Sequence, residues 1–255
     1  MPGKGGGGKS GKRLDVALVE RGLVDTRARA RAVIMAGSVF VSGERVDKAG
    51  AIVKDDAGIV LKGEALKYVS RGGLKLEAAL DAFGVGVSGL TAVDLGSSTG
   101  GFTDCLLQRG ASKVYAIDAG RGQLDWKLRN DPRVVSMEKF NARYLKPEDI
   151  DGAQVGIAVI DVSFISLMKI IPPAAGVLSP GGVLIALIKP QFEVGKGEVG
   201  KGGIVRDEAK RGEVVDKITA FVSSLGLDVR GVVESPITGA DGNVEYLICA
   251  VKPGL

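Results

Sequence analysis

Residues 91–118, TAVDLGSSTGGFTDCLLQRGASKVYAID, form the stretch that decides the fold. The stretch opens with a short apolar run, Thr91–Leu95, which is typical of a buried parallel strand. A glycine-containing loop follows, then a segment in helical register, then a second apolar run, Val114–Ile117, and a terminal acid. Strand, glycine loop, helix, strand and acid together predict a nucleotide-binding half of a doubly wound α/β sheet.

The loop and its flanking acids predict an adenosine-type ligand. Glycines let the backbone approach a ligand closely, and a helix start offers unpaired N–H groups to an anion. Asp118 follows Asp94 by 24 residues, about where a carboxylate reaches ribose hydroxyls. The spacing D-x-G-x-x-x-G-G, rather than G-x-G-x-x-G, favours S-adenosylmethionine over a dinucleotide. The expected cofactor-binding residues are Asp94, Gly96, Ser98, Thr99, Gly100, Gly101 and Asp118.

Composition excludes several classes of protein, among them membrane-spanning and disulfide-rich ones. The chain has 255 residues, of which 45% are hydrophobic, enough for one ordinary domain and a small partner. No apolar run approaches the roughly 18 residues that span a membrane. The two cysteines, Cys105 and Cys249, exclude a disulfide scaffold and a cysteine zinc cluster and suit a reducing cytoplasm. Histidine is absent, so we expect no metal site, and acid–base chemistry falls to Lys, Asp, Glu or Tyr.

Positive charge is concentrated near the N-terminus. Residues 1–71 carry 14 Lys/Arg and 8 Asp/Glu, a net charge of +6, whereas the remainder has a net charge of −2. This excess points to a polyanionic partner for the N-terminal quarter. Residues 1–12 hold six glycines and three lysines, and we expect this basic tail to be disordered.

Residues 13–62 predict a small α+β domain. A short helix ends at Gly22, and a second helix, Arg27–Met35, is capped by Asp25 or Thr26; short strands of a curled sheet follow. Arg27 and Arg31 lie one helical turn apart, and no acid lies between Thr26 and Gly43 to pair with them. We therefore expect these arginines to contact phosphate.

The arrangement LDVALVERGL…TRARARAVIMAGSVFVSGERV closely resembles the RNA-binding module named after ribosomal protein S-four. The resemblance implies that the second helix and the loop before the strands contact folded RNA. The RNA-contact residues that it implies in this domain are Arg13, Arg27, Arg29 and Arg31.

A linker, residues 63–69, leads to a second domain, residues 70–255. Three further strands are expected to end at Met137, near Asp161 and at Lys189-Pro190, and a closing antiparallel hairpin covers residues 229–251. A long loop rich in Gly and Lys, residues 191–205, precedes the last helix. Ligands gather at the carboxyl ends of parallel strands. We therefore expect four charged side chains to converge there: Lys75, Asp161, Lys189 and Glu245.

Lys–Asp–Lys–Glu in this order resembles the tetrad of RNA 2′-O-ribose methyltransferases. The wider motifs are SRGGLKL, DLGSSTGGFTDCLL, GQLDWKLRNDPRV, DVSFISL, IKPQFEVGKGEVGKGGIV and GNVEYL. Together with the N-terminal module they are similar to the TlyA (haemolysin A-like) family across almost the whole chain. The resemblance implies a Rossmann-like S-adenosylmethionine methyltransferase sheet with a closing antiparallel strand. It further implies 2′-O-methylation of cytidine in ribosomal RNA, within ribosomal subunits and away from any membrane. Arg71 and Lys196 complete the expected RNA-contact set.

The chemistry expected of the tetrad is proton removal from a ribose hydroxyl. Two lysines close together lower each other's pKa, which favours Lys189 as general base. Lys75 would hold the hydroxyl or a flanking phosphate, and Asp161 and Glu245 would orient the lysines. Methylation of a pyrimidine carbon would need a cysteine near the ligand, and methylation of an exocyclic amine would favour prolines where Asp161-Val162-Ser163-Phe164 stands. Two alternatives stay open: an RNA-binding protein without catalysis, and a pore-forming haemolysin.

Overall fold

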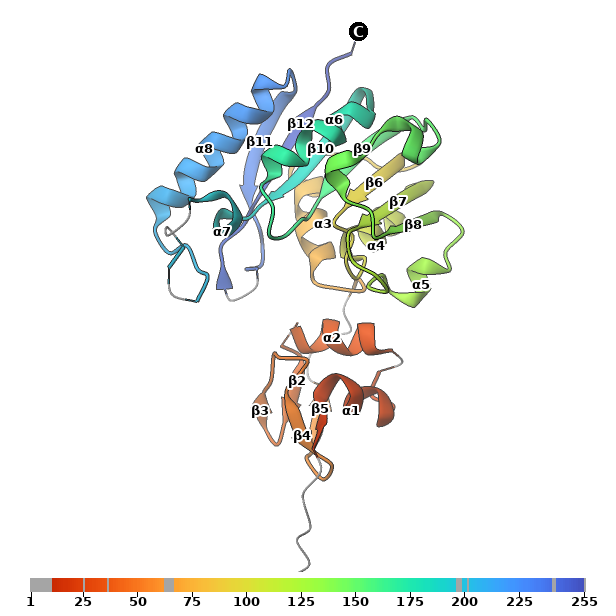
Figure 1. The fold of residues 1–255 in the computed structure, drawn as a ribbon, viewed down its shortest axis with the longest axis vertical. Coiled ribbons are helices and arrows are strands. Elements are labelled where there is room, and N and C mark those ends of the chain that lie inside the picture. The colour runs from red at the N-terminus through yellow and green to blue at the C-terminus, as the bar shows by residue number, and fades with distance from the viewer. Residues whose placement is uncertain are drawn as a thin grey trace, which may run out of the picture. The chain divides into compact units, whose positions relative to one another are not determined.

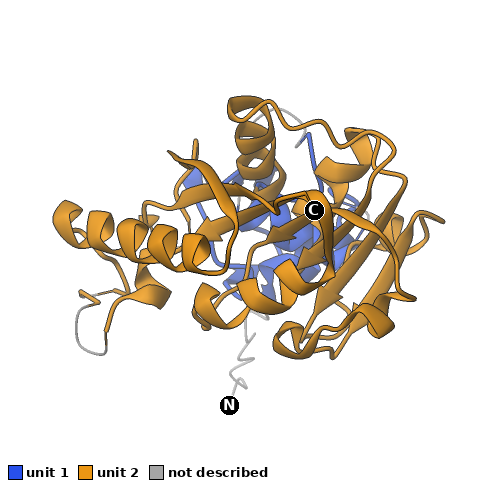
Figure 2. Ribbon diagram, turned by 90° about the horizontal axis from the view of Figure 1, so that it is seen from above, with its two compact units in different colours: residues 1–71 blue, residues 72–255 orange. Residues whose placement is uncertain are grey.

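The computed structural model describes residues 11–24, 26–35, 37–61, 67–195, 199–200, 202–239 and 242–254. The chain divides into two compact units, Met1–Arg71 and Gly72–Leu255 (Figure 2). This division falls two residues after the expected start of the second domain at Ser70.

Unit 1 begins with a strand that the sequence did not predict. Gly11–Arg13 forms β1, which pairs antiparallel with β4 (Ile52–Lys54) in the register Lys12 to Val53. The expectation of disorder is therefore wrong for residues 11 and 12. Their side chains are exposed, but backbone pairing with β4 orders them. The rest of the expected tail, residues 1–10, lies outside the described residues.

Two short helices and a three-stranded sheet complete unit 1. The helices are α1 (Leu14–Glu20) and α2 (Arg27–Met35), and the sheet has the order β3 (Glu44–Arg45), β2 (Val39–Val41), β5 (Ile59–Leu61). The Thr26 hydroxyl accepts a hydrogen bond from the Arg29 N–H at 3.1 Å, which confirms Thr26 as a cap of α2. Leu14, Leu18 and Ile34 are fully buried between the helices and the sheet, so the unit has a core of its own.

Unit 2 is built on a seven-stranded sheet with the order β11-β12-β10-β9-β6-β7-β8 (Figure 1). The strands are β6 (Thr91–Leu95), β7 (Lys113–Asp118), β8 (Val134–Glu138), β9 (Val155–Ile160), β10 (Leu178–Ile188), β11 (Asp228–Glu234) and β12 (Tyr246–Val251). β8, β7, β6, β9 and β10 run parallel, and β12 pairs antiparallel with both β10 and β11. The predicted α/β sheet with a closing antiparallel strand is confirmed.

Helices cover both faces of this sheet (Figure 1). They are α3 (Gly72–Ala82), α4 (Gly101–Gln108), α5 (Trp126–Arg129), α6 (Ile171–Val177), α7 (Pro190–Glu193) and α8 (Glu208–Ser224), with short 3₁₀ turns η1 (Ala142–Tyr144), η2 (Pro147–Ile150) and η3 (Leu167–Lys169). Side chains of α6 and α8 share one core with alternate residues of the strands, such as Leu95, Ile160 and Ile188. The pair α3 and α4 packs on the other face.

Three features of unit 2 differ from expectation in detail. The helix expected over residues 123–129 is only the single turn α5, because Asp125 caps it through the Lys127 N–H at 3.0 Å. The loop expected from Gln191 begins instead with α7, which starts at Pro190. β10 starts five residues before the predicted Val183, with an irregularity in its pairing with β9. Of the helices that the described residues form, none combines the length and apolarity that a membrane crossing requires.

Candidate active site

The carboxyl edge of the parallel strands brings the predicted tetrad together. Asp161 directly follows β9 and Lys189 directly follows β10, and these strands are hydrogen-bonded neighbours. β12 runs antiparallel to β10 with Ile188 opposite Tyr246. Extending that register by one residue places Lys189 opposite Glu245. Lys75, from the first turns of α3, reaches the same edge by contacting Glu245.

The four charges form two ion pairs. Lys75 donates to the Glu245 carboxylate in a pair that is almost wholly buried. Lys189 Nζ lies 2.5 Å from Asp161 Oδ1, and this pair is more open to solvent on the carboxylate side. The contacts that the structure shows for each lysine are thus to a carboxylate and not to the other lysine. Among the described residues, no group of three or more acidic or thiol side chains is placed to hold a metal ion.

Two residues beside Lys189 were missed as site residues. The Lys189 ammonium also donates to the Ser163 hydroxyl at 3.0 Å. Phe164 has a positive φ of 64° and is 91% exposed, and its ring lies 5.0 Å from that of Phe192 between centroids. A bulky residue in the left-handed region is strained by about 1–3 kcal/mol, and such residues cluster at functional sites. The backbone conformation of Phe164 carries no sequence signal.

Packing against neighbouring segments shapes the glycine loop. Gly96 and Gly100 have φ of 87° and 98°, in the left-handed region that glycine tolerates. A Cβ on Gly96 would meet the Asp161 carbonyl oxygen at 2.5 Å, and a Cβ on Gly100 would meet the Leu128 side chain. A side chain at Gly96 would therefore clash with the backbone that carries Asp161.

Asp118 holds the loop in place. Its two carboxylate oxygens accept hydrogen bonds from the Ser98 N–H at 2.8 Å and the Gly120 N–H at 2.6 Å. The Thr99 carbonyl accepts the Asp125 N–H at 3.1 Å, and Gly101 begins α4. The predicted loop residues thus share one hydrogen-bonded turn at the end of β6.

Asp94 is the most strongly perturbed acid of this loop. It is fully buried in β6, and its Oδ2 accepts from the Thr103 hydroxyl at 2.6 Å. Burial raises the pKa of Asp94 to about 7, against the opposing hydrogen bond from Thr103 and with smaller repulsion from Asp161 and Asp118. Its other oxygen, Oδ1, is buried and has no hydrogen-bond partner among the described residues. A cationic ligand group would satisfy it.

The cysteines lie apart from this chemistry. Cys105 in α4 and Cys249 in β12 are both buried, and burial raises the pKa of Cys249 to about 11. A thiol with a raised pKa is a poor nucleophile. The geometry therefore gives no support to attack by a cysteine.

Three arginines of unit 1 converge on one buried acid. Arg13 Nε lies 2.9 Å, Arg27 Nη2 2.8 Å and Arg31 Nε 3.5 Å from the carboxylate of Asp15, which is fully buried. Hydrogen bonds from Arg13 and then Arg27 hold the pKa of Asp15 far below its usual range. The expectation of unpaired arginines is therefore wrong, because the acid comes from α1 and not from their own helix. The cluster still carries two positive charges in excess.

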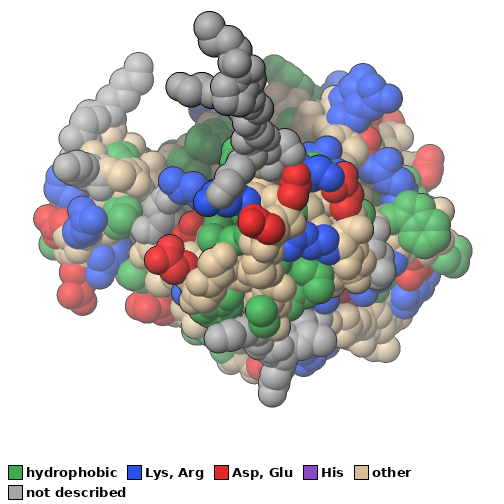
Figure 3. Space-filling model, turned by 90° about the horizontal axis from the view of Figure 1, so that it is seen from below, with side chains coloured by type: hydrophobic (Ala, Val, Ile, Leu, Met, Phe, Trp, Pro, Cys, Tyr) green, Lys and Arg blue, Asp and Glu red, His purple; other side chains and the backbone are tan. Residues whose placement is uncertain are grey.

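The other predicted RNA-contact residues are separate from this cluster. Arg29 Nη1 donates to the Tyr68 carbonyl at 3.4 Å. Burial lowers the pKa of Arg71, and so does the charge of Arg45, a second arginine that the sequence argument missed. Lys196 lies outside the described residues. Figure 3 shows that basic side chains on the face it presents are interspersed with acidic and apolar ones, so phosphate contact depends on individual positions and not on a uniform field.

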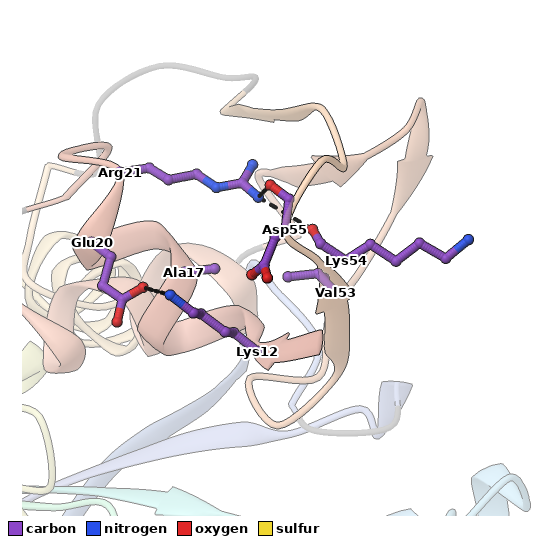
Figure 4. A pocket seen from close by; sticks show the side chains of 7 residues that line it. All are labelled: Lys12, Ala17, Glu20, Arg21, Val53, Lys54 and Asp55. Carbon is purple, nitrogen blue, oxygen red and sulfur yellow. Dashed lines mark hydrogen bonds and ion pairs between the residues drawn. The ribbon is translucent and has the colours of Figure 1, made fainter. Parts of the chain in front are cut away.

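A cavity of about 240 Å³ in unit 1 is not a further site (Figure 4). Lys12 is paired with Glu20 at 2.7 Å, and Arg21 donates to the carbonyls of Asp55 at 2.9 Å and Lys54 at 3.3 Å. The Lys54 side chain extends away from the others. Lys12 thus joins β1 to α1, and Arg21 joins the end of α1 to the end of β4.

Asn243 anchors the Gly- and Lys-rich loop beside the tetrad, and the sequence argument missed it. It is buried, its Oδ1 accepts from the Val205 N–H at 3.1 Å, and its Nδ2 donates to the Gly203 carbonyl at 3.0 Å. Asn243 stands two residues before Glu245 in the motif GNVEYL. Its burial and its two partners depend on how the loop packs, so the spacing alone did not indicate this role.

Comparison with known proteins agrees with this architecture. The FtsJ-like methyltransferase family matches residues 68–252, and the S4 domain family matches residues 12–59. The candidate rRNA methyltransferase YqxC of Bacillus subtilis is 51% identical over 95% of this chain and 86% of its own length. The 16S/23S rRNA (cytidine-2′-O)-methyltransferase TlyA of Mycobacterium tuberculosis is 46% identical over 92% of this chain and 88% of its own length.

One solved structure matches this chain over nearly its whole length. A candidate hemolysin of Streptococcus thermophilus is 47% identical and superposes with a TM-score of 0.76 over 96% of this chain and 90% of its own. The family matches, the relatives and the loop and tetrad geometry point to one group. The chain belongs to the FtsJ-like methyltransferases that carry an N-terminal S4 domain, the TlyA family.

Proposed function

We propose that this protein methylates the 2′-hydroxyl of a cytidine in ribosomal RNA, with S-adenosylmethionine as methyl donor. The observation that carries the proposal is the convergence of two lysine–carboxylate pairs at the sheet edge where the glycine loop ends. The rRNA (cytidine-2′-O)-methyltransferase activity named for the Mycobacterium tuberculosis relative, 46% identical, supports the same substrate.

The cofactor-binding residues fit a ligand with an ammonium group and ribose hydroxyls. The unpartnered, buried Asp94 Oδ1 suits a cation, which favours the ionised form of the carboxylate. Asp118 uses one lone pair of each oxygen to hold the loop, and a carboxylate has about four such acceptor positions. Two acceptor positions are left for ribose hydroxyls. When bound, the sulfonium supplies an electrophilic methyl group.

The tetrad would position the ribose hydroxyl and take its proton. A hydroxyl is a weak nucleophile until it is aimed in line and its proton is removed or shared. Lys189 has contacts at 2.5 Å with Asp161 and at 3.0 Å with Ser163, which fix its Nζ while leaving room for one more contact. We assign proton transfer at the 2′-oxygen to Lys189. Lys75, held by Glu245, is assigned to the hydroxyl or a flanking phosphate.

Phe164 suits the base of the nucleotide being modified. RNA-modifying enzymes commonly take the target nucleotide out of its stack and place its base against an aromatic side chain. Phe164 is exposed, is backed by Phe192, and lies one residue after Ser163, which contacts Lys189. A base stacked there would bring its ribose to the tetrad.

Unit 1 would hold the ribosomal RNA. The Asp15 carboxylate holds the guanidinium groups of Arg13, Arg27 and Arg31 close together. Arginine binds phosphate with directional hydrogen bonds, so this cluster suits the RNA backbone. Arg29, Arg71 and Lys196 are proposed as further phosphate contacts. We propose ribosomal subunits as the form in which the RNA is presented, and the cytoplasm as the compartment.

The test is methyl transfer from radiolabelled S-adenosylmethionine to purified ribosomal subunits. Label that enters rRNA and leaves one cytidine linkage resistant to alkali confirms the proposal, because a 2′-O-methyl group blocks attack by the ribose oxygen. Label in a base would contradict it. RNA binding without any transfer would favour the alternative of an RNA-binding protein, and the variant Lys189→Ala serves as the matched negative control.

A further inference from the structure

Backbone pairing between β9 and β10 ends before the residues that need to be aligned. The last paired residues are Ile160 and Ala186. Asp161 lies one residue beyond this point and Lys189 three residues beyond it. The Asp161 N–H still donates to the Leu95 carbonyl of β6 at 3.0 Å, and Ile188 still pairs with Tyr246 of β12, but β9–β10 backbone pairing does not set the distance between the two side chains.

Side-chain contacts continue the pairing beyond the sheet. In order along the two segments, they join Asp161 and Ser163 to Lys189, Phe164 to Phe192, and Ser166 and Leu167 to Glu193. We call these contacts the side-chain ladder. It keeps the parallel order of β9 and β10, and Glu193 is its far end.

Glu193 makes the two strongest contacts of the ladder after the ion pair. Its Oε2 accepts from the Ser166 hydroxyl at 2.7 Å, and its Oε1 accepts from the Leu167 N–H at 2.7 Å. The residue is 6% exposed, and burial raises the pKa of its carboxyl group. Lys217 of α8 donates to the Glu193 backbone carbonyl at 3.3 Å, which ties the end of α7 to a long helix.

We propose that Glu193 is a positioning residue for methyl transfer. It acts through Lys189 and Phe164, and this inference rests on the proposed function. Between Asp161 and Ser166 the chain turns through the strained Phe164, and between Lys189 and Glu193 it forms the single turn α7. The two segments are joined at one end by the Asp161–Lys189 ion pair. At the other end they are joined by the two hydrogen bonds that the Glu193 carboxylate accepts from Ser166 and Leu167. Without them the Ser163–Phe164 turn is free to relax away from Lys189.

The size of the effect follows from the geometry that is lost. A shift of about 1 Å at a reacting group costs up to about 10²-fold in rate. We therefore expect Glu193→Ala to lower the single-turnover rate by roughly 10- to 100-fold at saturating RNA and cofactor. Glu193→Gln keeps an acceptor for the Leu167 N–H and gives an amide that donates to Ser166, so its rate should stay within about threefold of wild type.

The experiment compares these variants with Glu213→Ala. Glu213 is an exposed glutamate on α8 that lines the same small cavity as Glu193, so it controls for loss of charge. Single-turnover methylation of ribosomal subunits and amide hydrogen exchange of residues 162–168 are measured for each protein. Glu193→Ala should lose rate and exchange protection, while Glu213→Ala should lose neither. A wild-type rate in Glu193→Ala would overturn the proposal.

A double variant separates positioning from general stability. If Glu193 acts through Lys189, adding Glu193→Ala to Lys189→Ala lowers the residual rate less than it lowers the wild-type rate. Equal losses in both backgrounds would contradict the proposal. Should Glu193→Ala fail to fold, Ser166→Ala removes one of the two bonds, and an unchanged rate in that variant overturns the proposal. If wild type transfers no methyl group, the proposed function fails, and hydrogen exchange still tests the ladder.

Discussion

Asp94→Asn should stabilise the protein without its cofactor, and increasingly so as pH rises. The folded protein raises the pKa of Asp94 from 3.8 to about 7, so it holds a proton that the unfolded chain releases. The contribution of Asp94 to the stability of the folded state is therefore fully present below pH 4 and is lost as pH rises through 7. A shift of about three pKa units corresponds to about 4 kcal/mol, of which roughly 2–3 kcal/mol falls between pH 5 and pH 8. Asparagine is neutral throughout and can still accept the Thr103 hydrogen bond.

Urea unfolding of both proteins at pH 5, 6, 7 and 8 measures this difference. The difference in free energy of unfolding, Asp94→Asn minus wild type, should increase by roughly 2–3 kcal/mol from pH 5 to pH 8. The comparison cancels every group that titrates equally in the two proteins. A constant difference at all four pH values would refute the assignment of a buried, protonated Asp94. Thr103→Val, which removes the opposing hydrogen bond, should steepen the pH dependence of the otherwise wild-type protein.

Three further predictions address catalysis, RNA binding and the cofactor loop. Lys189→Ala should bind RNA and cofactor but lose about 10²–10⁴-fold in methyl transfer. Lys189→Arg should not restore the rate, because a guanidinium keeps its proton. Near-wild-type turnover in Lys189→Arg would leave Lys189 only a neutralising role. Arg27→Glu with Arg31→Glu should weaken RNA binding and flatten its dependence on salt by about two units of slope, with cofactor affinity by calorimetry unchanged. Asp118→Ala should raise the cofactor's dissociation constant, and Gly96→Val should also lower thermal stability because its Cβ meets the Asp161 carbonyl; wild-type affinity in Asp118→Ala would contradict its assigned role.

The sequence predicts backbone topology well because apolar runs and glycines report it directly. The strand ends at Asp161 and Lys189 followed from two apolar runs, and their adjacency followed from the sheet order expected of the fold. The antiparallel last strand then placed Glu245 at the same edge. Each of these inferences needs only periodicity and the known handedness and order of such sheets.

Side-chain partners across distant segments were harder to predict. Asp15 lies on α1 and pairs with arginines that lie up to 16 residues later, so inspection of helical neighbours alone could not find it. Glu193 falls within the Gly- and Lys-rich loop expected over residues 191–205, and nothing in that stretch indicates its partners, Ser166 and Leu167. The positive φ of Phe164 is imposed by tertiary contacts and has no local cause. Contacts of this kind depend on how distant segments pack together, which the local periodicity of the sequence does not report.

The position of β12 has a consequence for how the chain folds during synthesis. Among the described strands of this sheet, β12 comes after all the others in the sequence, yet it lies between β10 and β11 and is the strand with which β11 pairs. Until residues 246–251 emerge, β11 has no place in the sheet and Glu245 cannot reach Lys75. A growing chain can therefore pair its five parallel strands before β12 is made, whereas the tetrad assembles only after Glu245 and β12 have joined the sheet.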